Sequence, residues 1–420
     1  MKNIEKRQRK SNRLTRVETA MNIINGNHTL ESRMLLIQQL IPIGLMAVEE
    51  ALQAEVTQLA GVRYRHDDTP HQRWGSNIGS VYLGHQKHGI RVPRVRNKKN
   101  GQAVPLKSYR ALQSDQEIND RTLAQVINGI SARKFEKAAM QIPSAFGIQK
   151  SSVSRKFIQA SARQLKVFQE RDLTRHDIIV IFMDGKSFAQ NEMIIALGVT
   201  LSGQKIVLGA IESGTENHKV CRDFLSQLQE RGLQSEEKLL FVIDGSKGLR
   251  KGIKTVFGKQ AIIQRCQWHK RENVVAYLPK SEQSRIRKKL QKAYEQKDYR
   301  QAKQKLYAIR RELRLINASA VRSLDEGLEE TLTIHRLGLF EHLGISLKTT
   351  NCIESLNSQL AQYTRRVSYW KNSNQRQRWI ATALLEIEPS LRKIKGYRFL
   401  PLLKNNMEQF IQEKDQPKAA

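Results

Sequence analysis

The segment between Asp177 and Tyr277 constrains the fold more than any other part of the chain, because short apolar runs follow one another there in a fixed order. The first three runs are rich in β-branched residues and are bounded by polar turns: "DIIVIFMDG", "MIIALGVT" and "KIVLGAIES". Runs of this length and composition are typical of buried strands. The segment therefore begins with three predicted strands in series.

Two helices and two further strands are predicted after these three. Helical spacing over 216–231 ends at Gly232, and helical spacing over 246–257 ends at Gly258. Between the two helices "KLLFVIDG" predicts a fourth strand, and "AIIQRC" after them predicts a fifth. The order β-β-β-α-β-α-β is that of a ribonuclease H-like domain, so we expect an α/β fold with such a catalytic core.

An aspartate ends the first predicted strand and another ends the fourth, namely Asp184 and Asp244. In a ribonuclease H-like sheet these two strands are neighbours, so the carboxylates would meet at one edge of a cleft. Mg²⁺ prefers oxygen ligands, and two ions roughly 4 Å apart can activate a hydroxyl and stabilise a leaving oxygen in phosphoryl transfer. Ordinary turn chemistry is the alternative, because Asp-Gly is common after a strand. Two such strand ends in a strongly basic chain favour a site for two Mg²⁺ ions, for which Mn²⁺ can substitute.

A third carboxylate is expected on a helix after the fifth strand. A long, basic, helical stretch over 280–347 intervenes and predicts an all-helical insertion. Behind it "LKTTNCIESLNSQLAQYTRRV" predicts a helix with its cap among residues 349–351, which places Glu354 near the positive helix start. Glutamate is common in any first helical turn. Its position after the insertion makes Glu354 the predicted third metal ligand.

The formal charge of +32, from 72 Lys and Arg against 40 Asp and Glu, indicates the partner. A compact chain with this charge repels itself unless a polyanion is near, so nucleic acid is expected, although a ribosomal or structural binder fits equally well. Three cysteines without paired spacing predict a reducing compartment. The longest uncharged apolar run, 34–48, is too short for a membrane span, and the basic start lacks the apolar core of a signal peptide. We expect a cytoplasmic, nucleoid-associated protein.

The part before residue 116 is expected to contact DNA through its backbone phosphates. Apolar residues at helical spacing over 31–60 predict one or two helices broken near Pro42. "SVYLG" and "GIRVPRVR" predict strands in a basic segment, where residues 85–110 include eight Lys and Arg and no acid. A solvated basic hairpin is the alternative. The absence of acids favours DNA contacts by Arg94 and Arg96.

Three helical stretches over 120–161 are separated by short breaks, which is the pattern of a helix-turn-helix. The third stretch begins with hydroxyl and basic residues, at the end where a recognition helix meets base edges and phosphates. These predicted DNA-binding residues are Ser151, Ser152, Ser154, Arg155 and Lys156. A plain helical bundle has the same periodicity.

Four motifs, "MDGKSF", "FVIDGSKGLRKGI", "QRCQWHKREN" and "TTNCIESLNSQL", resemble in this order those of the DDE transposases of the Mutator superfamily, in its prokaryotic insertion-sequence branch. The resemblance covers most of the chain. It implies that Asp184, Asp244 and Glu354 are the catalytic triad, and that the chain acts on double-stranded DNA at terminal inverted repeats and at a target, as a homodimer. One departure is visible, because Gly185 and Lys186 follow the first aspartate where many relatives have alanine.

Cys266 and His269 match the C-x-x-H signature of that superfamily. A structural zinc ion needs four ligands, and neither Cys221 nor Cys352 has a CxxC or CxxH partner nearby. We therefore expect Cys266 and His269 to support the cleft, without a zinc ion and without a nucleophilic thiol. Trp268, between them, fits core packing and stacking on an unpaired base equally well.

The predicted function is that of an insertion-sequence transposase, which cleaves and transfers DNA strands. A ribonuclease H-like structure-specific nuclease would cleave without joining, and a DNA-binding transcription regulator would not need the three carboxylates. The expected domains are a basic helical region (1–61), a basic β-rich segment (62–115), a helix-turn-helix (116–175), the first part of the core (176–279), the helical insertion (280–347) and the C-terminal helices of the core (348–420).

Overall fold

A computed structural model of the chain describes residues 30–65, 68–83, 86–113, 123, 126–127, 150–188, 191–214, 217–234, 238–365, 367 and 369–415. The chain divides into two compact units, Met1–Ala160 and Ser161–Ala420. Each unit has a hydrophobic core of its own.

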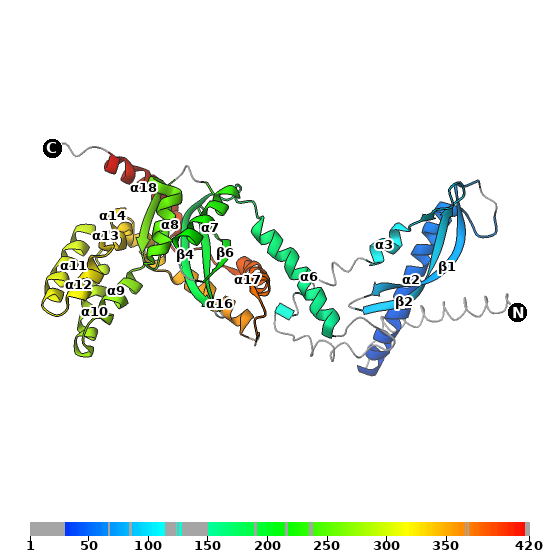
Figure 1. Cartoon of the computed structure of the whole chain (residues 1–420), viewed down its shortest axis with the longest axis horizontal. Coiled ribbons are helices and arrows are strands. Elements are labelled where there is room, and N and C mark those ends of the chain that lie inside the picture. Colours follow the sequence, from blue (N-terminus) through cyan, green and yellow to red (C-terminus); the bar gives the residue numbers. More distant parts are fainter. Residues whose placement is uncertain are drawn as a thin grey trace. The chain divides into compact units, whose positions relative to one another are not determined.

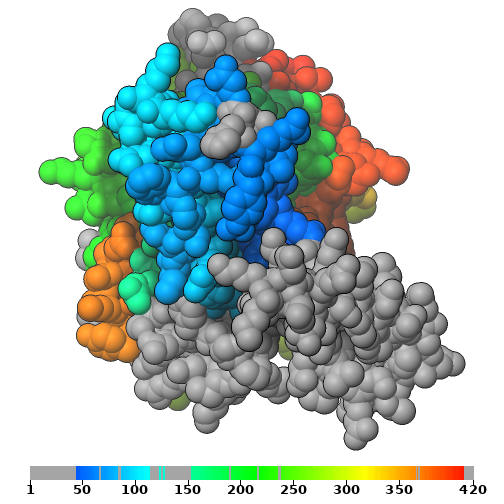
Figure 2. Space-filling model, turned by 90° about the vertical axis from the view of Figure 1, so that its right-hand side faces the viewer, coloured from blue at the N-terminus to red at the C-terminus, as the bar shows by residue number. Residues whose placement is uncertain are grey.

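The first unit packs one long helix against a β-hairpin (Figure 1). Helix α2 (Leu30–Ala60) lies along strands β1 (His71–Leu83) and β2 (Gln86–Asn97), which pair antiparallel. Their shared core includes Leu52, Val56, Val81, Val92 and Val95. The short strand β3 (Ala103–Val104) extends the sheet beside β2, and helix α3 (Lys107–Gln113) follows it. The described residues of α2 and of the hairpin are coloured in shades of blue in Figure 2.

The strands predicted in this unit are confirmed, but the predicted break near Pro42 is wrong, because α2 passes through that residue without interruption. A proline removes one helix hydrogen bond and bends a helix more readily than it ends one when good helix formers flank it. Helix α6 (Lys150–Gln169) confirms the third helical stretch of the predicted helix-turn-helix. The first two stretches lie mostly outside the described residues.

The described strands of the second unit form a five-stranded sheet in the order β6-β5-β4-β7-β8. Their bounds are Ile178–Phe188 for β4, Asn191–Thr200 for β5, Lys205–Ser213 for β6, Leu239–Ile243 for β7 and Ala261–Arg265 for β8. The first three strands pair antiparallel, whereas β4, β7 and β8 pair parallel. The five predicted strands and the adjacency of the first and the fourth are confirmed.

The two faces of this sheet carry different helices. Helices α7 (His218–Glu230) and α8 (Lys247–Phe257) cover the face to which Met183 points (Figure 1). Side chains alternate along a strand, so Asp184 points to the opposite face. That face is contacted by α16 (Asn351–Thr364), whose Asn357 side chain reaches Asp184.

Helices fill the chain between β8 and α16, as the sequence predicts for 280–347. They are α9 (Gln267–Ala276), α10 (Lys280–Tyr294), α11 (Tyr299–Arg314), α12 (Ala318–Asp325), α13 (Leu328–Thr331), α14 (Thr333–Arg336) and α15 (Phe340–Leu347). Helices α9 to α13 share a separate apolar core, which includes Leu290, Leu306 and Leu324.

The insertion is fastened to the edge strand β8, since Thr333 Oγ1 donates to the Ile263 carbonyl oxygen at 2.6 Å. Helices α17 (Ser373–Ile387) and α18 (Leu400–Asp415) complete the unit. Among the helices that the structure describes, none combines the length and the hydrophobicity that a membrane span requires.

Candidate active site

Three residues follow equivalent positions of three neighbouring strands of the sheet. The parallel register pairs Met183 with Ile243, and Ile243 with Arg265. In-register parallel strands place equivalent side chains on the same face. The three residues that follow these paired positions are Asp184, Asp244 and Cys266. Of the two predicted aspartates, Asp184 thus lies within β4, and Asp244 directly follows the neighbouring strand β7.

Strand β4 does not end at Asp184, as the sequence suggested, but continues to Phe188. Only its pairing with β7 stops, at Met183. On the other side, β5 pairs with β4 throughout, and Ile195 lies opposite Asp184. A strand that keeps one backbone partner remains extended, so Asp184 is fixed within a strand, with only 9% of its surface exposed.

Asn357 of α16 connects that helix to Asp184. Its side-chain Nδ2 donates to Asp184 Oδ2 at 3.3 Å, and its backbone carbonyl oxygen accepts from Lys186 Nζ at 3.2 Å. Asn357 is buried, and its Oδ1 has no hydrogen-bond partner among the described residues. Glu354 precedes Asn357 by three positions, which places both on one side of the helix. The contact therefore fixes the helix that carries the third predicted acid.

Thr350 links Glu354 to His269. It is the N-cap residue of α16, but its side chain makes no capping bond to the backbone. Instead, Thr350 Oγ1 donates to Glu354 Oε1 at 2.9 Å and lies 3.4 Å from His269 Nδ1. The first turn of α16 and the first turn of α9 thus meet through one hydroxyl.

The interaction with Cys266 raises the pKa of His269 to about 9, against the effect of burial, and the charges of Asp244 and Glu354 contribute to the increase. These interactions favour the protonated ring, in which both nitrogens can donate hydrogen bonds. Burial favours the neutral Cys266 thiol, but hydrogen bonds with His269 and Thr350 outweigh it, so the net pKa of Cys266 is lowered. His269 is thus the positive charge among these acids.

The turn after Asp244 is held by the start of α8. The backbone N–H of Ser246 donates to Asp244 Oδ1 at 2.9 Å, and Ser246 Oγ accepts from the Leu249 N–H at 3.2 Å. Gly245, between them, has a φ of +128°, which L-residues with a side chain rarely adopt. The predicted Ser246 start and Gly258 end of α8 are confirmed, and together they hold Asp244 where β7 ends.

Whether these residues suit a metal ion depends on donor type and on distance. Asp184, Asp244 and Glu354 offer carboxylate oxygens, and the unpaired Asn357 Oδ1 lies beside the first of them. Oxygen donors of this kind suit Mg²⁺. Within the described ranges, no three His, Cys, Asp or Glu side chains are close enough together to form a metal site. The three acids fit such an ion in chemistry, without being gathered around one point.

Trp268 lies at the surface beside this network. Its ring meets the His269 ring edge-on, with the centroids 4.8 Å apart, and 48% of its surface is exposed. A ring that is half exposed is not enclosed by the core, so part of it remains accessible to a ligand.

The basic residues predicted on the hairpin occupy its β2 strand. The side chain of Arg94 is exposed, and its Nε donates to the Trp74 carbonyl oxygen at 3.2 Å. The Arg96 guanidinium lies 4.6 Å from the centre of the Trp74 ring and donates to the Gly101 carbonyl oxygen. Arg96 therefore also supports the hairpin, whereas Arg94 is the more open of the two.

The residues predicted on the recognition helix lie at the start of α6. Ser154 and Arg155 are exposed. Lys156 is 9% exposed, with its ammonium group 4.7 Å from the centre of the Tyr82 ring. Ser151 and Ser152 belong to the helix by backbone, but their side chains lie outside the description. The helix thus presents Ser154 and Arg155 outward and directs Lys156 toward β1.

Sequence reasoning missed two residues of the network, Asn357 and Thr350 in its linking role. Asn357 carried a signal, since it lies three positions after Glu354 on the same helix side. Thr350 was recognised only as a possible cap, because a hydroxyl before a helix usually bonds to the backbone.

Comparison with known proteins shows the family to which the chain belongs. The family model described as "Transposase, Mutator family" matches residues 27–392. The transposase for insertion sequence element ISRM5 of Rhizobium meliloti is 26% identical over 364 residues, which are 83% of this chain and 88% of that protein. The transposase for IS905 of Lactococcus lactis is 26% identical over 80% of this chain and 85% of its own length. The transposase for insertion sequence element IS256 in transposon Tn4001 of Staphylococcus aureus is 26% identical over 71% of this chain and 76% of its own length. Because the family model spans most of the sequence, the chain belongs to the Mutator family of transposases.

Proposed function

We propose that this chain is the transposase of a prokaryotic insertion sequence, which cleaves DNA strands at the ends of its element and joins them to a target. The observation that carries this proposal is the register of β4 and β7. Met183 pairs with Ile243, so Asp184 and Asp244 follow paired residues, and Asn357 connects the helix of Glu354 to β4. The insertion-sequence transposases among its relatives support the same activity.

The second unit is proposed to be a ribonuclease H-like core. Support comes from the sheet order, in which the first strand lies between the second and the fourth, and from the parallel pairing of the fourth and the fifth strands. The helical insertion enters after the fifth strand and precedes the helix of Glu354. In this proposal, the six-part division of the chain keeps the boundaries expected from the sequence.

Asp184, Asp244 and Glu354 are proposed to hold two Mg²⁺ ions, with Mn²⁺ as a substitute. When bound, such ions supply the positive charge that activates an attacking hydroxyl and stabilises a leaving oxygen. The protein's own part is orientation. Asn357 donates to Asp184, the Ser246 N–H donates to Asp244, and Thr350 donates to Glu354. Cys266 and His269 support Glu354 through Thr350.

The DNA is proposed to be the terminal inverted repeats of the element and a target duplex, bound by a homodimer in the nucleoid of the cytoplasm. Arg94 and Arg96 would contact backbone phosphates, and the start of α6 would read sequence through Ser151, Ser152, Ser154, Arg155 and Lys156. Trp268 would offer its accessible ring surface to an unpaired base. The charge of +32 supports a polyanionic partner for the whole chain.

The test is a gel assay of the purified full chain with DNA carrying candidate element ends, with and without Mg²⁺. We expect nicking and strand transfer that require the metal ion. Asp184→Ala, Asp244→Ala and Glu354→Ala should each abolish cleavage and leave end binding nearly intact. Glu230→Ala is the matched control, because it removes an exposed carboxylate at the end of α7.

Two other outcomes would favour the alternatives. Cleavage without joining, under conditions that capture a joined product, would indicate a hydrolytic nuclease. Specific binding without any metal-dependent nick would indicate a transcription regulator. A triad variant that nicks at the wild-type rate would remove that residue from the proposed site.

A further inference from the structure

Helix α8 carries a basic surface on the face of the sheet opposite the Asp184 side chain. The helix begins three residues after Asp244, and its sequence, "KGLRKGIKTVF", contains four cations and no acid. The cations at 247, 251 and 254 recur at intervals of four and three positions, so they lie along one side of the helix. A solvated helix usually mixes both signs of charge, so a helix with one sign indicates an anionic partner.

A cavity of about 650 Å³ lies between this side of α8 and the turn at Gly327. Its lining includes one acid, Glu326, and five cations: Lys247, Arg250, Lys251, Lys254 and Arg265. The cavity is therefore a groove with a strong excess of positive charge, and we call it the α8 groove.

The arginines of the α8 groove are engaged by acids of the insertion. Arg250 Nε donates to Glu330 Oε1 at 2.7 Å, and Arg265 Nε donates to Glu330 Oε2 at 2.7 Å. Arg265 Nη1 also lies 3.6 Å from Glu326 Oε1. These pairs neutralise the charges of the two arginines and join α8 and β8 to the insertion. The excess charge therefore comes from the lysines.

The lysines are placed differently from the arginines. Lys254 Nζ donates to the Ala261 carbonyl oxygen at 2.7 Å, so this ammonium group is engaged by the end of its own helix and the start of β8. In the described part of the chain, the ammonium groups of Lys247 and Lys251 take part in no hydrogen bond or ion pair, and both side chains are exposed. Two free ammonium groups four positions apart suit neighbouring phosphates of one strand.

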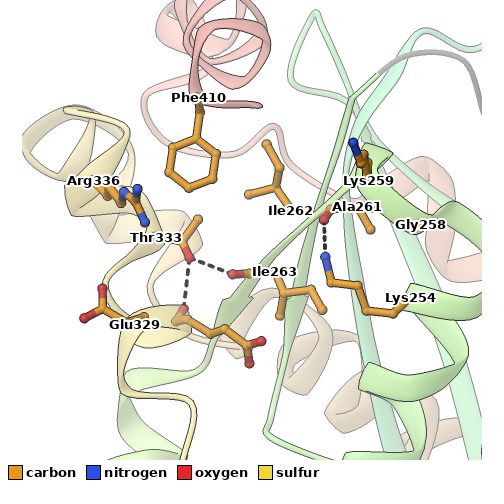
Figure 3. A pocket seen from close by; sticks show the side chains of 11 residues that line it. Lys254, Gly258, Lys259, Ala261, Ile262, Ile263, Glu329, Thr333, Arg336 and Phe410 are labelled. Carbon is orange, nitrogen blue, oxygen red and sulfur yellow. Dashed lines mark hydrogen bonds between the residues drawn. The ribbon is translucent and has the colours of Figure 1, made fainter. Parts of the chain in front are cut away.

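A second cavity, of about 280 Å³, adjoins the end of α8 and provides a contrast (Figure 3). Lys254 lines both cavities. The smaller one is lined by apolar side chains, by three cations (Lys254, Lys259 and Arg336) and by two acids (Glu329 and Glu330), and Arg336 lies against the Phe410 ring. The two acids nearly balance its three cations, whereas the α8 groove has one acid against five cations. The α8 groove is the one whose chemistry matches a polyanion.

We propose that the α8 groove binds the sugar-phosphate backbone of a DNA segment. This segment would flank the DNA bound at Asp184, Asp244 and Glu354. Lys247 and Lys251 would make the direct phosphate contacts. This inference rests on the proposed function. The groove lies on the face opposite Asp184, so it contributes to DNA affinity and does not take part in the chemical step.

The experiment compares Lys247→Gln/Lys251→Gln with Lys288→Gln/Lys292→Gln in the full chain. The control removes the same charge at the same spacing from exposed positions of α10. Affinity for a random-sequence duplex is measured against KCl concentration. Two lost phosphate contacts should lower the slope of log K against log salt by about 1.8, since each contributes about 0.9. Lysine acetylation mapped by mass spectrometry should show that DNA protects Lys247 and Lys251.

In a cleavage assay, the groove variant should need more DNA for half-maximal rate and keep the wild-type rate at saturation. Equal slopes for the groove and control variants, or no protection of Lys247 and Lys251, would overturn the proposal. A wild-type chain that neither binds nor cleaves DNA would instead overturn the proposed function. The two failures are therefore distinguishable.

Discussion

Asn357 Nδ2 lies 3.3 Å from Asp184 Oδ2, although 173 positions separate the two residues in the chain. The helical insertion lies between them in sequence, and α16 still returns to the strand of the first aspartate. One buried amide thus joins the carboxylate of β4 to the helix that carries Glu354. The position of the third acid relative to the first depends on this contact.

The first prediction concerns Asn357 as a positioning residue. Asn357→Ala removes the donor to Asp184 Oδ2, so the carboxylate should turn and bind metal less well. We expect cleavage to fall about 10–100-fold, the usual range for an outer partner of a metal ligand. The concentration of Mg²⁺ for half-maximal cleavage should rise as well.

Thr364→Val is the matched control for Asn357→Ala. It removes another buried polar group of α16, whose hydroxyl donates to the Leu360 carbonyl oxygen at 3.1 Å. It should lower stability without moving the Mg²⁺ dependence. The positioning role fails if Asn357→Ala loses stability but keeps the wild-type Mg²⁺ dependence.

The second prediction sets a supporting role of Cys266 and His269 against a zinc half-site. In the supporting role, Cys266→Ser and His269→Ala should leave the fold and the metal content unchanged and lower cleavage or joining about 10–100-fold. Thr350→Val should reproduce much of the His269→Ala loss, since Thr350 connects the ring to Glu354. The double variant should lose less than the sum of the two single losses.

Elemental analysis of the purified protein decides between the two roles. A structural zinc ion contributes folding free energy, so its loss would unfold the core. About one tightly held zinc ion per chain, released by either variant, would contradict the supporting role.

How far the sequence predicts this molecule depends on the range of the interactions. The strands of residues 177–265 are predictable because each is a local apolar run with its own bounding turns. Capping by Ser246 and the helix end at Gly258 are equally local. The continuity of α2 through Pro42 is not predictable in this way, because a proline within a helical pattern is compatible with a bend as well as with a helix end.

Side-chain contacts of the site lie beyond such local patterns. The alignment of Asp184, Asp244 and Cys266 follows from strand register, which is a property of the sheet as a whole. The Asn357 contact joins residues on either side of the insertion. A hydroxyl such as Thr350 has several partners available, and only the meeting of α9 and α16 selects His269 and Glu354.

The third prediction separates sequence reading from phosphate contact in the first unit. Arg155→Gln should reduce the preference for element ends over random DNA, because the exposed start of α6 is proposed to meet base edges. Arg94→Gln should weaken binding to element ends and to random DNA equally, and should lower the slope of log K against log salt by about 0.9. Arg94 is preferable to Arg96 here, since Arg96 also stacks on Trp74. Equal losses on both DNAs for Arg155→Gln would move recognition to another element.

The last prediction concerns the acid sensitivity of the insertion, through His335. This ring is buried, stacks on Phe340 with centroids 3.8 Å apart, and lies with Nε2 3.1 Å from the Tyr294 carbonyl oxygen. Burial lowers the pKa of His335 from 6.5 to about 4. The unfolded chain therefore binds this proton more tightly than the folded chain.

The stabilisation from neutral His335 is complete above pH 6.5 and is lost as the pH falls toward 4. At pH 5 the loss amounts to about 2 kcal/mol of unfolding free energy. His335→Gln keeps a donor for the Tyr294 carbonyl oxygen but does not titrate. Between pH 7 and pH 5 the unfolding free energy of this variant should therefore fall by about 2 kcal/mol less than that of the wild type. Denaturant unfolding at the two pH values measures the difference, and His342→Gln, at an exposed ring, is the control. Identical pH dependence in wild type and His335→Gln would show that His335 is not the group that makes the insertion acid-sensitive.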